Sequence, residues 1–323
     1  MSWVLGVDSG GSGLRIALGS PAADRPAEVV SAGGPVRTGP RGIDAGHLLE
    51  LLLPAVAGLL KRAGADGLDA VALGAAGLAT LGDDLRAELP GALESSLGVR
   101  RLALAADAVT AYAGALGQRP GVVVAAGTGM IALGTDLAGW RRADGWGHLL
   151  GDCGGGAWIG RAGLEAAMRS HDGRRGGSTA LLARVEAVFG SAPQLPGLLY
   201  PRTDRPAVLA SFAPEVARCA PADPVASAIL REAARQIAET AAAACPPSGE
   251  CEVALTGGLF RMGDPLFVPL HEELAELLPH ARQVPAAGDP LVGALRIASA
   301  LATGDLRLPR DPGLLSVVAD PGS

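Results

Sequence analysis

The sequence predicts an α/β protein of two domains, each a mixed sheet with flanking helices. Short apolar runs, typical of buried strands, alternate with longer segments of helical apolar spacing along most of the chain. At 323 residues the chain is longer than one compact core usually accommodates. A strand, a glycine-rich turn and a second strand occur twice, in residues 3–19 and 122–134. We therefore expect domains over residues 1–118 and 119–310, each beginning with a glycine hairpin, and a tail over residues 311–323.

The first half is expected to open with a hairpin at one edge of a largely parallel sheet. An apolar run ends at Asp8, a turn of small residues covers 9–13, and a second apolar run covers 14–18. The hairpin adds antiparallel strands, which makes the sheet mixed. The next elements are a strand over 27–32, a helix over 43–63, a strand over 68–75, a helix over 83–97, a strand over 101–106 and a helix over 108–116.

The second half repeats the opening pattern and then becomes mainly helical. The expected elements are a strand over 122–126, a turn over 127–129, strands over 130–134 and 139–142, a glycine-rich segment over 145–160, a helix to about 169, mostly helix over 178–245, a strand over 252–255, and helices over 265–278 and 290–302. The last helix is placed so that it can pack back on the first domain. The proline-rich tail from Leu308 is expected to be loosely held.

Composition excludes several classes of protein. The chain is 49% hydrophobic and 19% charged with a net charge of −6, and no basic tract indicates a nucleic acid partner. Because Lys61 is the only lysine, a lysine-based phosphate clamp would have to use a residue of a predicted surface helix. No Cys-x-x-Cys pair occurs, which argues against a zinc ribbon or an iron–sulfur activator. With neither a signal peptide nor a bilayer-spanning segment visible, we expect a cytoplasmic protein with reduced thiols and no membrane partner.

The first glycine turn has the composition of a phosphate-binding loop. Its glycines, Gly10, Gly11 and Gly13, let backbone N–H groups approach an anion without an intervening Cβ. Ser12 can add a hydroxyl donor, and Asp8 can hold a hydrated Mg²⁺ near a polyphosphate. The alternative is an ordinary glycine-rich hairpin.

The second turn, Gly127-Thr128-Gly129, begins a G-x-G-x-x-A pattern. A dinucleotide fingerprint requires a helix after the glycines, whereas residues 130–134 are short, apolar and ended by glycine, as in a strand. We therefore interpret it as a second phosphate hairpin, with Thr128 donating a hydroxyl. Facing each other, the two hairpins could grip the β- and γ-phosphates of ATP, with backbone amides in place of the missing lysine.

Three further positions are candidates for chemistry. Asp107 ends a strand and begins a helix, so it can serve as a general base in phosphoryl transfer or as a helix N-cap. Asp152 precedes three glycines and a helix, and it can bind sugar hydroxyls or cap that helix. Gly257 and Gly258 follow a strand, where they can leave room for an adenine ring or form a tight turn.

Five segments, in this order, resemble the actin-like sugar kinase superfamily, and more narrowly the N-acetylglucosamine kinases and BadF/BadG/BcrA/BcrD-type ATPases. They are Val7–Ser12, Ala105–Ala108, Gly127–Gly129, Gly145-Trp146-Gly147 with Gly151-Asp152, and Leu255–Gly258. The resemblance implies two actin-like (ribonuclease H-like) domains around a central cleft, with ATP and Mg²⁺ as cofactors. It implies Asp107 as catalytic base, the Gly145–Asp152 segment as sugar-binding, and often a homodimer.

The chain departs from the family pattern at several expected sugar contacts. Met130 and Ile131 stand where the family often has polar residues, and Arg37 and Thr38 lie where it often has an asparagine. The serine common in the region before Gly77 is alanine here. Because a site built to bond a hydroxyl or amide discriminates strongly, these changes should alter substrate choice. Arg37 and Thr38 could serve a different or more anionic sugar.

The expected function is an ATP-dependent sugar kinase. It would transfer the γ-phosphoryl of Mg-ATP to a hydroxyl, with O6 the expected acceptor, of N-acetylglucosamine or a related amino sugar. Two alternatives stay open: a sugar- or nucleotide-sensing protein with little turnover, and an ATPase that activates a partner enzyme.

Overall fold

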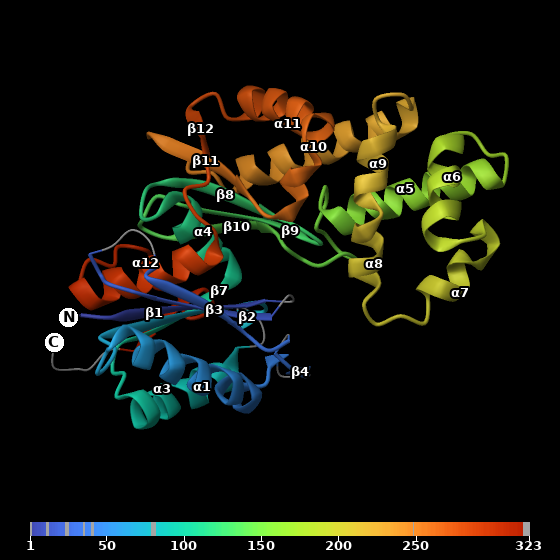
Figure 1. Ribbon diagram of the computed structural model, residues 1–323. Coiled ribbons are helices and arrows are strands. Elements are labelled where there is room, and N and C mark those ends of the chain that lie inside the picture. The colour runs from blue at the N-terminus through green and yellow to red at the C-terminus, as the bar shows by residue number, and fades with distance from the viewer. Residues whose placement is uncertain are drawn as a thin grey trace. The chain divides into compact units, whose positions relative to one another are not determined.

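The computed structural model describes residues 2–10, 13–22, 26–34, 36–39, 42–78, 82–247 and 249–318. The chain divides into two compact units (Figure 1). The first unit comprises Met1–Gly121, Gly134–Trp140 and Val284–Ser323, and the second comprises Val122–Leu133 and Arg141–Gln283. Each unit has its own hydrophobic core.

The first unit is built on a six-stranded sheet in the order β13-β7-β6-β1-β2-β3. The strands are β1 (Val4–Gly10), β2 (Gly13–Gly19), β3 (Glu28–Ala32), β6 (Ala70–Ala75), β7 (Leu102–Ala106) and β13 (Leu315–Val318). β1 pairs antiparallel with β2 and parallel with β6, so the sheet is mixed. β6 and β7 are buried at every position, as expected for central parallel strands covered on both faces. A separate two-stranded pair joins β4 (Thr38–Gly39) to β5 (Gly42–Ile43).

Helices cover both faces of this sheet (Figure 1). α1 (Ala45–Ala63) and α3 (Asp83–Leu97) lie on one face, and α4 (Asp107–Leu116) and α12 (Pro290–Thr303) on the other. The Asp44 side chain caps α1 by accepting from the His47 N–H, and Gly64 ends it in the left-handed conformation. Lys61 is exposed in the last turn of α1, where a positive charge is favourable.

A glycine sets how closely α12 approaches α4. A Cβ added to Gly293 would lie 1.8 Å from the carbonyl oxygen of Thr110. No side chain fits at that distance, so the backbones of the two helices are in direct contact there. Arg296 of α12 also donates to the carbonyl oxygens of Ala113 and Gly114. Residues from the end of the chain thus complete the core begun by its first strands.

The second unit contains a five-stranded sheet in the order β10-β9-β8-β11-β12. The strands are β8 (Gly121–Ala126), β9 (Met130–Thr135), β10 (Trp140–Asp144), β11 (Cys251–Thr256) and β12 (Ala281–Pro285). The helices are α5 (Gly156–His171), α6 (Thr179–Phe189), α7 (Leu195–Leu199), α8 (Arg205–Ser211), α9 (Ala213–Cys219), α10 (Pro224–Ala244) and α11 (Asp264–Leu277). Two sheets with flanking helices confirm the predicted α/β class.

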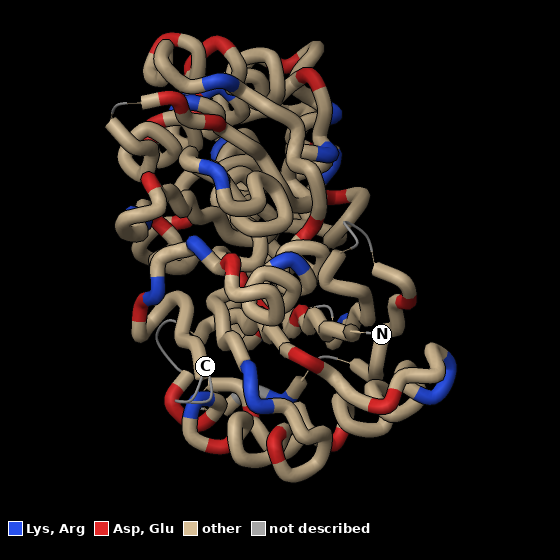
Figure 2. Tube along the Cα trace, turned by 90° about the vertical axis from the view of Figure 1, so that its left-hand side faces the viewer, with Lys and Arg blue, Asp and Glu red and all other residues tan. Residues whose placement is uncertain are grey.

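Basic and acidic residues are interspersed over the traced chain (Figure 2). Many form pairs one helical turn apart, such as Arg169 with Glu165 in α5 and Arg235 with Glu232 in α10. Within the ranges that the structure describes, no helix combines the length and apolarity that a membrane crossing requires.

The prediction of a loosely held tail is wrong for residues 308–318. β13 pairs antiparallel with β7, and Leu315 is fully buried. Nearby, the Trp140 Nε1–H donates to the Pro309 carbonyl oxygen at 2.7 Å. The physical reason is the open edge of β7, whose unpaired backbone groups and apolar side chains a short apolar strand can cover. Residues 319–323 lie outside the described part of the chain.

Candidate functional site

The second glycine turn and the start of α5 form one backbone structure. The Gly127 N–H donates to the Gly129 carbonyl oxygen at 2.9 Å and closes the turn. The Gly156 and Ala157 N–H groups donate to the carbonyl oxygens of Gly127 and Thr128 at 2.9 and 2.8 Å. These bonds satisfy two N–H groups of the first turn of α5, which have no partners inside the helix. The carbonyl side of the turn therefore faces α5.

Close approach explains the glycines where α5 begins. A Cβ on Gly156 would lie 2.6 Å from the Gly127 carbonyl oxygen, and one on Gly155 would lie 2.9 Å from the Gly129 carbonyl carbon. Both distances are too short for a real Cβ. Residues 127–129 and 155–156, which the sequence analysis treated separately, are therefore in direct backbone contact.

Asp152 links the predicted sugar segment to the same turn. Its side chain is 9% exposed, and its Oδ1 accepts from the Gly147 N–H at 3.1 Å. Its carboxylate also accepts from the Met130 N–H. A Cβ on Gly129 would lie 2.4 Å from Asp152 Oδ2, so this oxygen lies against the turn. The structure thus brings together Gly147, Asp152, Gly129 and Met130, all of which were site predictions.

Asp144 braces this loop, and the sequence analysis missed it. Its carboxylate accepts from the Asp152 N–H at 2.7 Å and from the Cys153 N–H at 2.9 Å. Asp144 and Asp152 have φ angles of 58° and 55°, in the left-handed region that non-glycine residues rarely adopt. Backbone strain of this kind persists only where surrounding contacts hold it, and it gathers at functional sites. The loop is a preformed feature of the second unit.

The charge state of Asp152 is perturbed. Burial raises the pKa of Asp152, the hydrogen bond from the Gly147 N–H opposes the rise, and the negative charge of Asp144 adds to it. Asp152 therefore binds a proton at higher pH than an ordinary aspartate does. Burial also raises the pKa of the neighbouring Cys153 thiol, which argues against a reactive thiolate there.

Trp146, Met130 and Ile131 occupy different environments. Trp146 is 64% exposed, and the guanidinium carbon of Arg142 lies 4.5 Å from its ring centroid. Met130 is 2% exposed within the core of the second unit. Ile131 lies against Gly145, where an added Cβ would meet its Cδ1 at 2.8 Å. Packing thus accounts for the apolar pair that follows the turn.

Asp107 is the first residue of α4, directly after β7. Its carboxylate is exposed, and its Oδ1 accepts from the Ala108 N–H at 2.9 Å. The cap position belongs to Ala106, and no side chain caps this helix end. The N-cap interpretation of Asp107 is therefore wrong by one residue. The helix N-terminus nevertheless favours a negative charge at this position.

Asp8 is engaged by an arginine that the sequence analysis did not single out. In the hairpin register Asp8 lies opposite Arg15, whose Nη2 and Nε donate to Asp8 Oδ2 at 2.6 and 3.1 Å. Arg15 also binds Asp289 Oδ2 at 2.7 Å. One carboxylate already paired with a cation is not by itself a magnesium site. It fits a metal that brings further oxygen ligands, as Mg²⁺ bound to a polyphosphate does.

The structure describes the other predicted residues to different extents. A Cβ on Gly10 would meet no atom within 4 Å, and Gly13 has φ 130°; Gly11 and Ser12 lie outside the described residues. Gly258 also has open space, whereas a Cβ on Gly257 would lie 2.1 Å from the Ala126 carbonyl oxygen. Arg37 is exposed and Thr38 begins β4.

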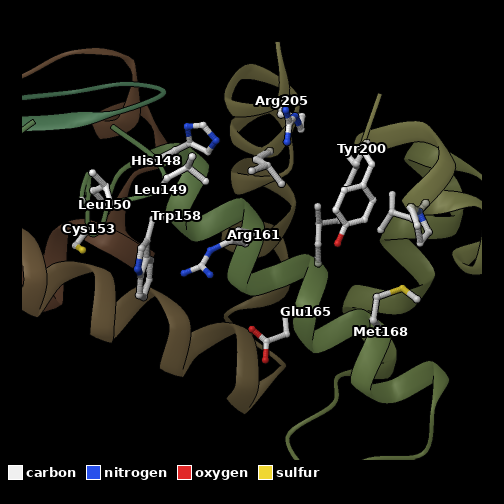
Figure 3. A pocket seen from close by; sticks show the side chains of 16 residues that line it. His148, Leu149, Leu150, Cys153, Trp158, Arg161, Glu165, Met168, Tyr200 and Arg205 are labelled. Carbon is white, nitrogen blue, oxygen red and sulfur yellow. The ribbon is translucent and has the colours of Figure 1, made fainter. Parts of the chain in front are cut away.

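A cavity of about 620 Å³ adjoins the sugar segment within the second unit (Figure 3). Trp158, Arg161 and Met168 extend from α5, and Tyr200 and Arg205 come from the region of α7 and α8. The remaining lining residues are His148, Leu149, Leu150, Gly151, Cys153, Leu164, Glu165, Leu195, Pro196, Leu199 and Leu209. Trp158 packs against the core of the second unit and also lines this cavity.

The cavity is apolar with an excess of positive charge. Within the described part of the chain, Arg161 makes no hydrogen bond or ion pair. Glu165 is paired with Arg169, at 2.8 Å, and Arg205 donates its Nε–H to the Arg202 carbonyl oxygen. An unpaired guanidinium among apolar walls favours a ligand that carries both an apolar body and an anionic group.

Comparisons with known proteins agree with these features. The profile of the BadF/BadG/BcrA/BcrD ATPase family matches residues 5–298. Over 183 residues the chain is 30% identical to an N-acetylmuramic acid/N-acetylglucosamine kinase of Clostridium acetobutylicum. That match covers 56% of this chain and 58% of the relative, so it spans a little over half the relative's length.

Solved structures share the fold over nearly the whole chain. A candidate N-acetylglucosamine kinase from Chromobacterium violaceum is 29% identical, with a TM-score of 0.73 over 94% of this chain and 99% of that one. A ROK family glucokinase from Streptomyces griseus, 19% identical, has a TM-score of 0.52 over 92% of this chain and 98% of that one. The predicted fold class, that of the actin-like sugar kinases, is confirmed.

Proposed function

Because the chain belongs to the BadF/BadG/BcrA/BcrD ATPase family, we propose that it is an ATP-dependent kinase that phosphorylates O6 of an N-acetylated amino sugar. The observation that carries this proposal is the braced loop over 144–152, whose Asp152 carboxylate lies against Gly129 of the turn and accepts from the N–H of Met130 directly after it. A sugar-binding loop fixed to a phosphate-binding turn can hold two substrates in a reactive orientation. The activity of the C. acetobutylicum relative supports an amino sugar as the acceptor.

The glycine turns are proposed to bind the nucleotide. Gly10 to Gly13 would present backbone amides to the phosphates, and Thr128 would add its hydroxyl beside Gly127 and Gly129. Gly257 and Gly258 would leave space for the adenosine. Mg²⁺, when bound with ATP, neutralises charge on the transferring phosphoryl group. Arg15 donates to Oδ2 of Asp8. The Oδ1 atom of Asp8 would therefore orient a water ligand of that ion.

Asp107 is proposed as the general base. Its exposed carboxylate can accept the proton of the sugar hydroxyl as that oxygen attacks the γ-phosphorus. The hydrogen bond from Ala108 and the N-terminus of α4 favour the ionised carboxylate before the reaction. Exposure also leaves the side chain accessible to a substrate.

The sugar is proposed to bind at Asp152 and residues 145–147. Asp152 would accept from one ring hydroxyl, and Trp146, exposed and placed by Arg142, would lie against the ring. Met130 and Ile131 would shape the loop through packing. Arg37 and Thr38 remain proposals for contact with a more anionic sugar. A homodimer, often formed in this family, also remains a proposal.

The cavity beside this loop supports a sugar with an apolar, anionic substituent. N-acetylmuramic acid is an example, because its lactyl ether combines a methyl group with a carboxylate. Arg161 would pair with that carboxylate. Replacing it with methionine removes the charge while keeping most of the apolar stem. We expect Arg161→Met to raise the KM for N-acetylmuramic acid about tenfold or more and to change the KM for N-acetylglucosamine less than twofold.

The decisive experiment is a coupled ADP-release assay with Mg-ATP. The acceptors are N-acetylmuramic acid, N-acetylglucosamine, glucosamine, N-acetylmannosamine, glucose and no sugar. We expect turnover of about 1–100 s⁻¹ with an N-acetylated amino sugar, and the product's phosphate position, read by NMR, at O6. If no sugar raises ADP release above the control, the kinase proposal fails, and a thermal shift with a sugar alone would then indicate a sensor.

A further inference from the structure

Three side chains that can bind a metal ion meet at the end of the second unit's sheet where β11 begins. Cys245 follows α10, Cys251 is the first residue of β11, and His280 lies in the turn between α11 and β12. The two sulfur atoms are 3.5 Å apart, and the ligand atoms of all three residues lie within 4.8 Å of one another. The cysteines are 4% and 3% exposed, whereas His280 is exposed.

We propose that Cys245, Cys251 and His280 bind a zinc ion. Zn²⁺ takes sulfur ligands at about 2.3 Å and nitrogen ligands at about 2.0–2.1 Å in tetrahedral geometry, which separates neighbouring ligand atoms by about 3.5–3.8 Å. The observed separations require only small side-chain movements to reach these values. Two thiolates and an imidazole bind Zn²⁺ in preference to Mg²⁺ or Ca²⁺. The fourth ligand would be a water on the side of the exposed histidine.

The surroundings orient the proposed ligands. His280 Nε2 lies 3.1 Å from the Pro246 carbonyl oxygen. In the tautomer that donates from Nε2, the other ring nitrogen keeps its lone pair for a metal. A backbone carbonyl that holds the second nitrogen of a metal-binding histidine is a common arrangement. Pro246 and Pro247 also restrict the backbone directly after Cys245, which lowers the entropy lost when the loop closes on an ion.

The ion would serve structure rather than phosphoryl transfer. It would join the α10–β11 connection to the α11–β12 turn, and so fix the start of β11 and the end of α11. Gly257, the predicted adenosine contact, follows the opposite end of β11. The six residues of that strand span about 20 Å at about 3.3 Å each. Binding needs only the loss of protons from two thiols and no oxidant, unlike a disulfide between the same sulfurs.

The other two cysteines provide matched controls. Cys153 and Cys219 are free thiols outside the cluster. The wild-type protein, a Cys245→Ser/Cys251→Ser variant, a His280→Ala variant and a Cys153→Ser/Cys219→Ser variant are purified under reducing conditions, stripped with chelator and reloaded with zinc. Bound metal is measured by mass spectrometry after gel filtration, and cobalt is substituted to detect thiolate-to-metal charge-transfer absorption.

We expect the wild-type and control proteins to retain one zinc per chain and to show the charge-transfer band. The Cys245→Ser/Cys251→Ser variant should lose both, and His280→Ala should bind zinc at least about tenfold more weakly. Zinc at about 100 times its Kd should raise the wild-type Tm by about 5 °C. The proposal is overturned if wild-type protein retains no zinc, if the cluster variant retains as much as the control, or if peptide mapping of reloaded protein finds Cys245 and Cys251 joined by a disulfide.

Discussion

Three aspartate side chains have different surroundings, and these surroundings suggest a separate role for each. Asp107 is exposed at the start of a helix, and Asp152 is buried against a glycine turn. The Asp144 carboxylate accepts hydrogen bonds from two backbone N–H groups. The exposed carboxylate can be reached by a substrate hydroxyl, the buried one is suited to orient a ligand, and the third holds the loop. The same residue type is thus suited to three roles, a base, a ligand-binding group and a support for the loop, because its surroundings differ.

If Asp107 is the base, Asp107→Asn should lower kcat by about 10²–10⁴ with little change in KM. Asparagine keeps the shape but cannot accept the proton. Asp264 is a matched control, because it is also exposed and also the first residue of a helix, α11. Asp264→Asn should leave kcat within about twofold. Similar losses in both variants would assign the effect to helix stability instead.

The pH dependence of stability should differ in sign between Asp152 and Asp289. Because the pKa of Asp152 is raised above the ordinary 3.8, the folded state binds the extra proton, and the stability associated with this group falls as pH rises through the raised pKa. Burial alone would raise the pKa of Asp289, but the Val292 N–H and Arg15 outweigh it and lower that pKa. Its contribution is present above the ordinary value and is lost as pH falls through the lowered one.

Thermal melts at pH 7 and at about pH 2.5 test this pair, because the lower pH lies below the ordinary value of 3.8 for both carboxyl groups. The difference in Tm between Asp152→Asn and wild type should be more favourable to the variant at pH 7 than at the lower pH. For Asp289→Asn the difference should be less favourable at pH 7. Equal pH trends in the two variants would contradict the assignment.

At the scale of elements, the turn at 127–129 and the N-terminus of α5 depend on each other. Gly156→Ala would place a Cβ 2.6 Å from the Gly127 carbonyl oxygen, so the turn and helix must separate. We expect a loss of about 1–3 kcal/mol in the free energy of unfolding and a higher KM for ATP. Gly91→Ala in α3, where nothing lies within 4 Å of the added Cβ, should instead stabilise by about 0.5–1 kcal/mol. Denaturant titrations and ATP kinetics distinguish the two.

The elements also show what a sequence can and cannot predict. Helix α3, residues 83–97, has a periodic apolar pattern, and both of its ends lie where the sequence predicts them. The pairing of Asp8 with Arg15 follows from the observed register, in which Gly10 pairs with Gly13, and a turn predicted over residues 9–13 does not fix that register. The role of Asp144 was not available from the sequence either, because it depends on a left-handed loop returning to residue 144 eight positions later. β12 was missed because a polar edge strand has little apolar pattern.

At the scale of the whole molecule, two separate cores predict two unfolding events. The core of the first unit gathers around β1, β6 and α1, and the core of the second gathers around α5, α10 and β8. Calorimetry should therefore give a van't Hoff enthalpy below the calorimetric enthalpy.

Leu315→Ala, at a fully buried position of β13, should lower only one transition, by about 2–5 kcal/mol. Val318→Ala, at a position 42% exposed, should change stability by less than about 0.5 kcal/mol. A single transition that both variants leave intact would refute the two-core description.

The first unit consists of three separate stretches, and this has a consequence for synthesis on the ribosome. Its sheet needs α12 and β13, which come after residue 283. The second unit is encoded almost entirely between these parts, so its chain is complete while the first still lacks a helix and an edge strand. At about 5–20 residues per second, translation from residue 121 to residue 284 takes about 10–30 s. The half of the protein that emerges first is thus the last to be finished, and its open β7 edge is the part that a nascent-chain chaperone would have to protect.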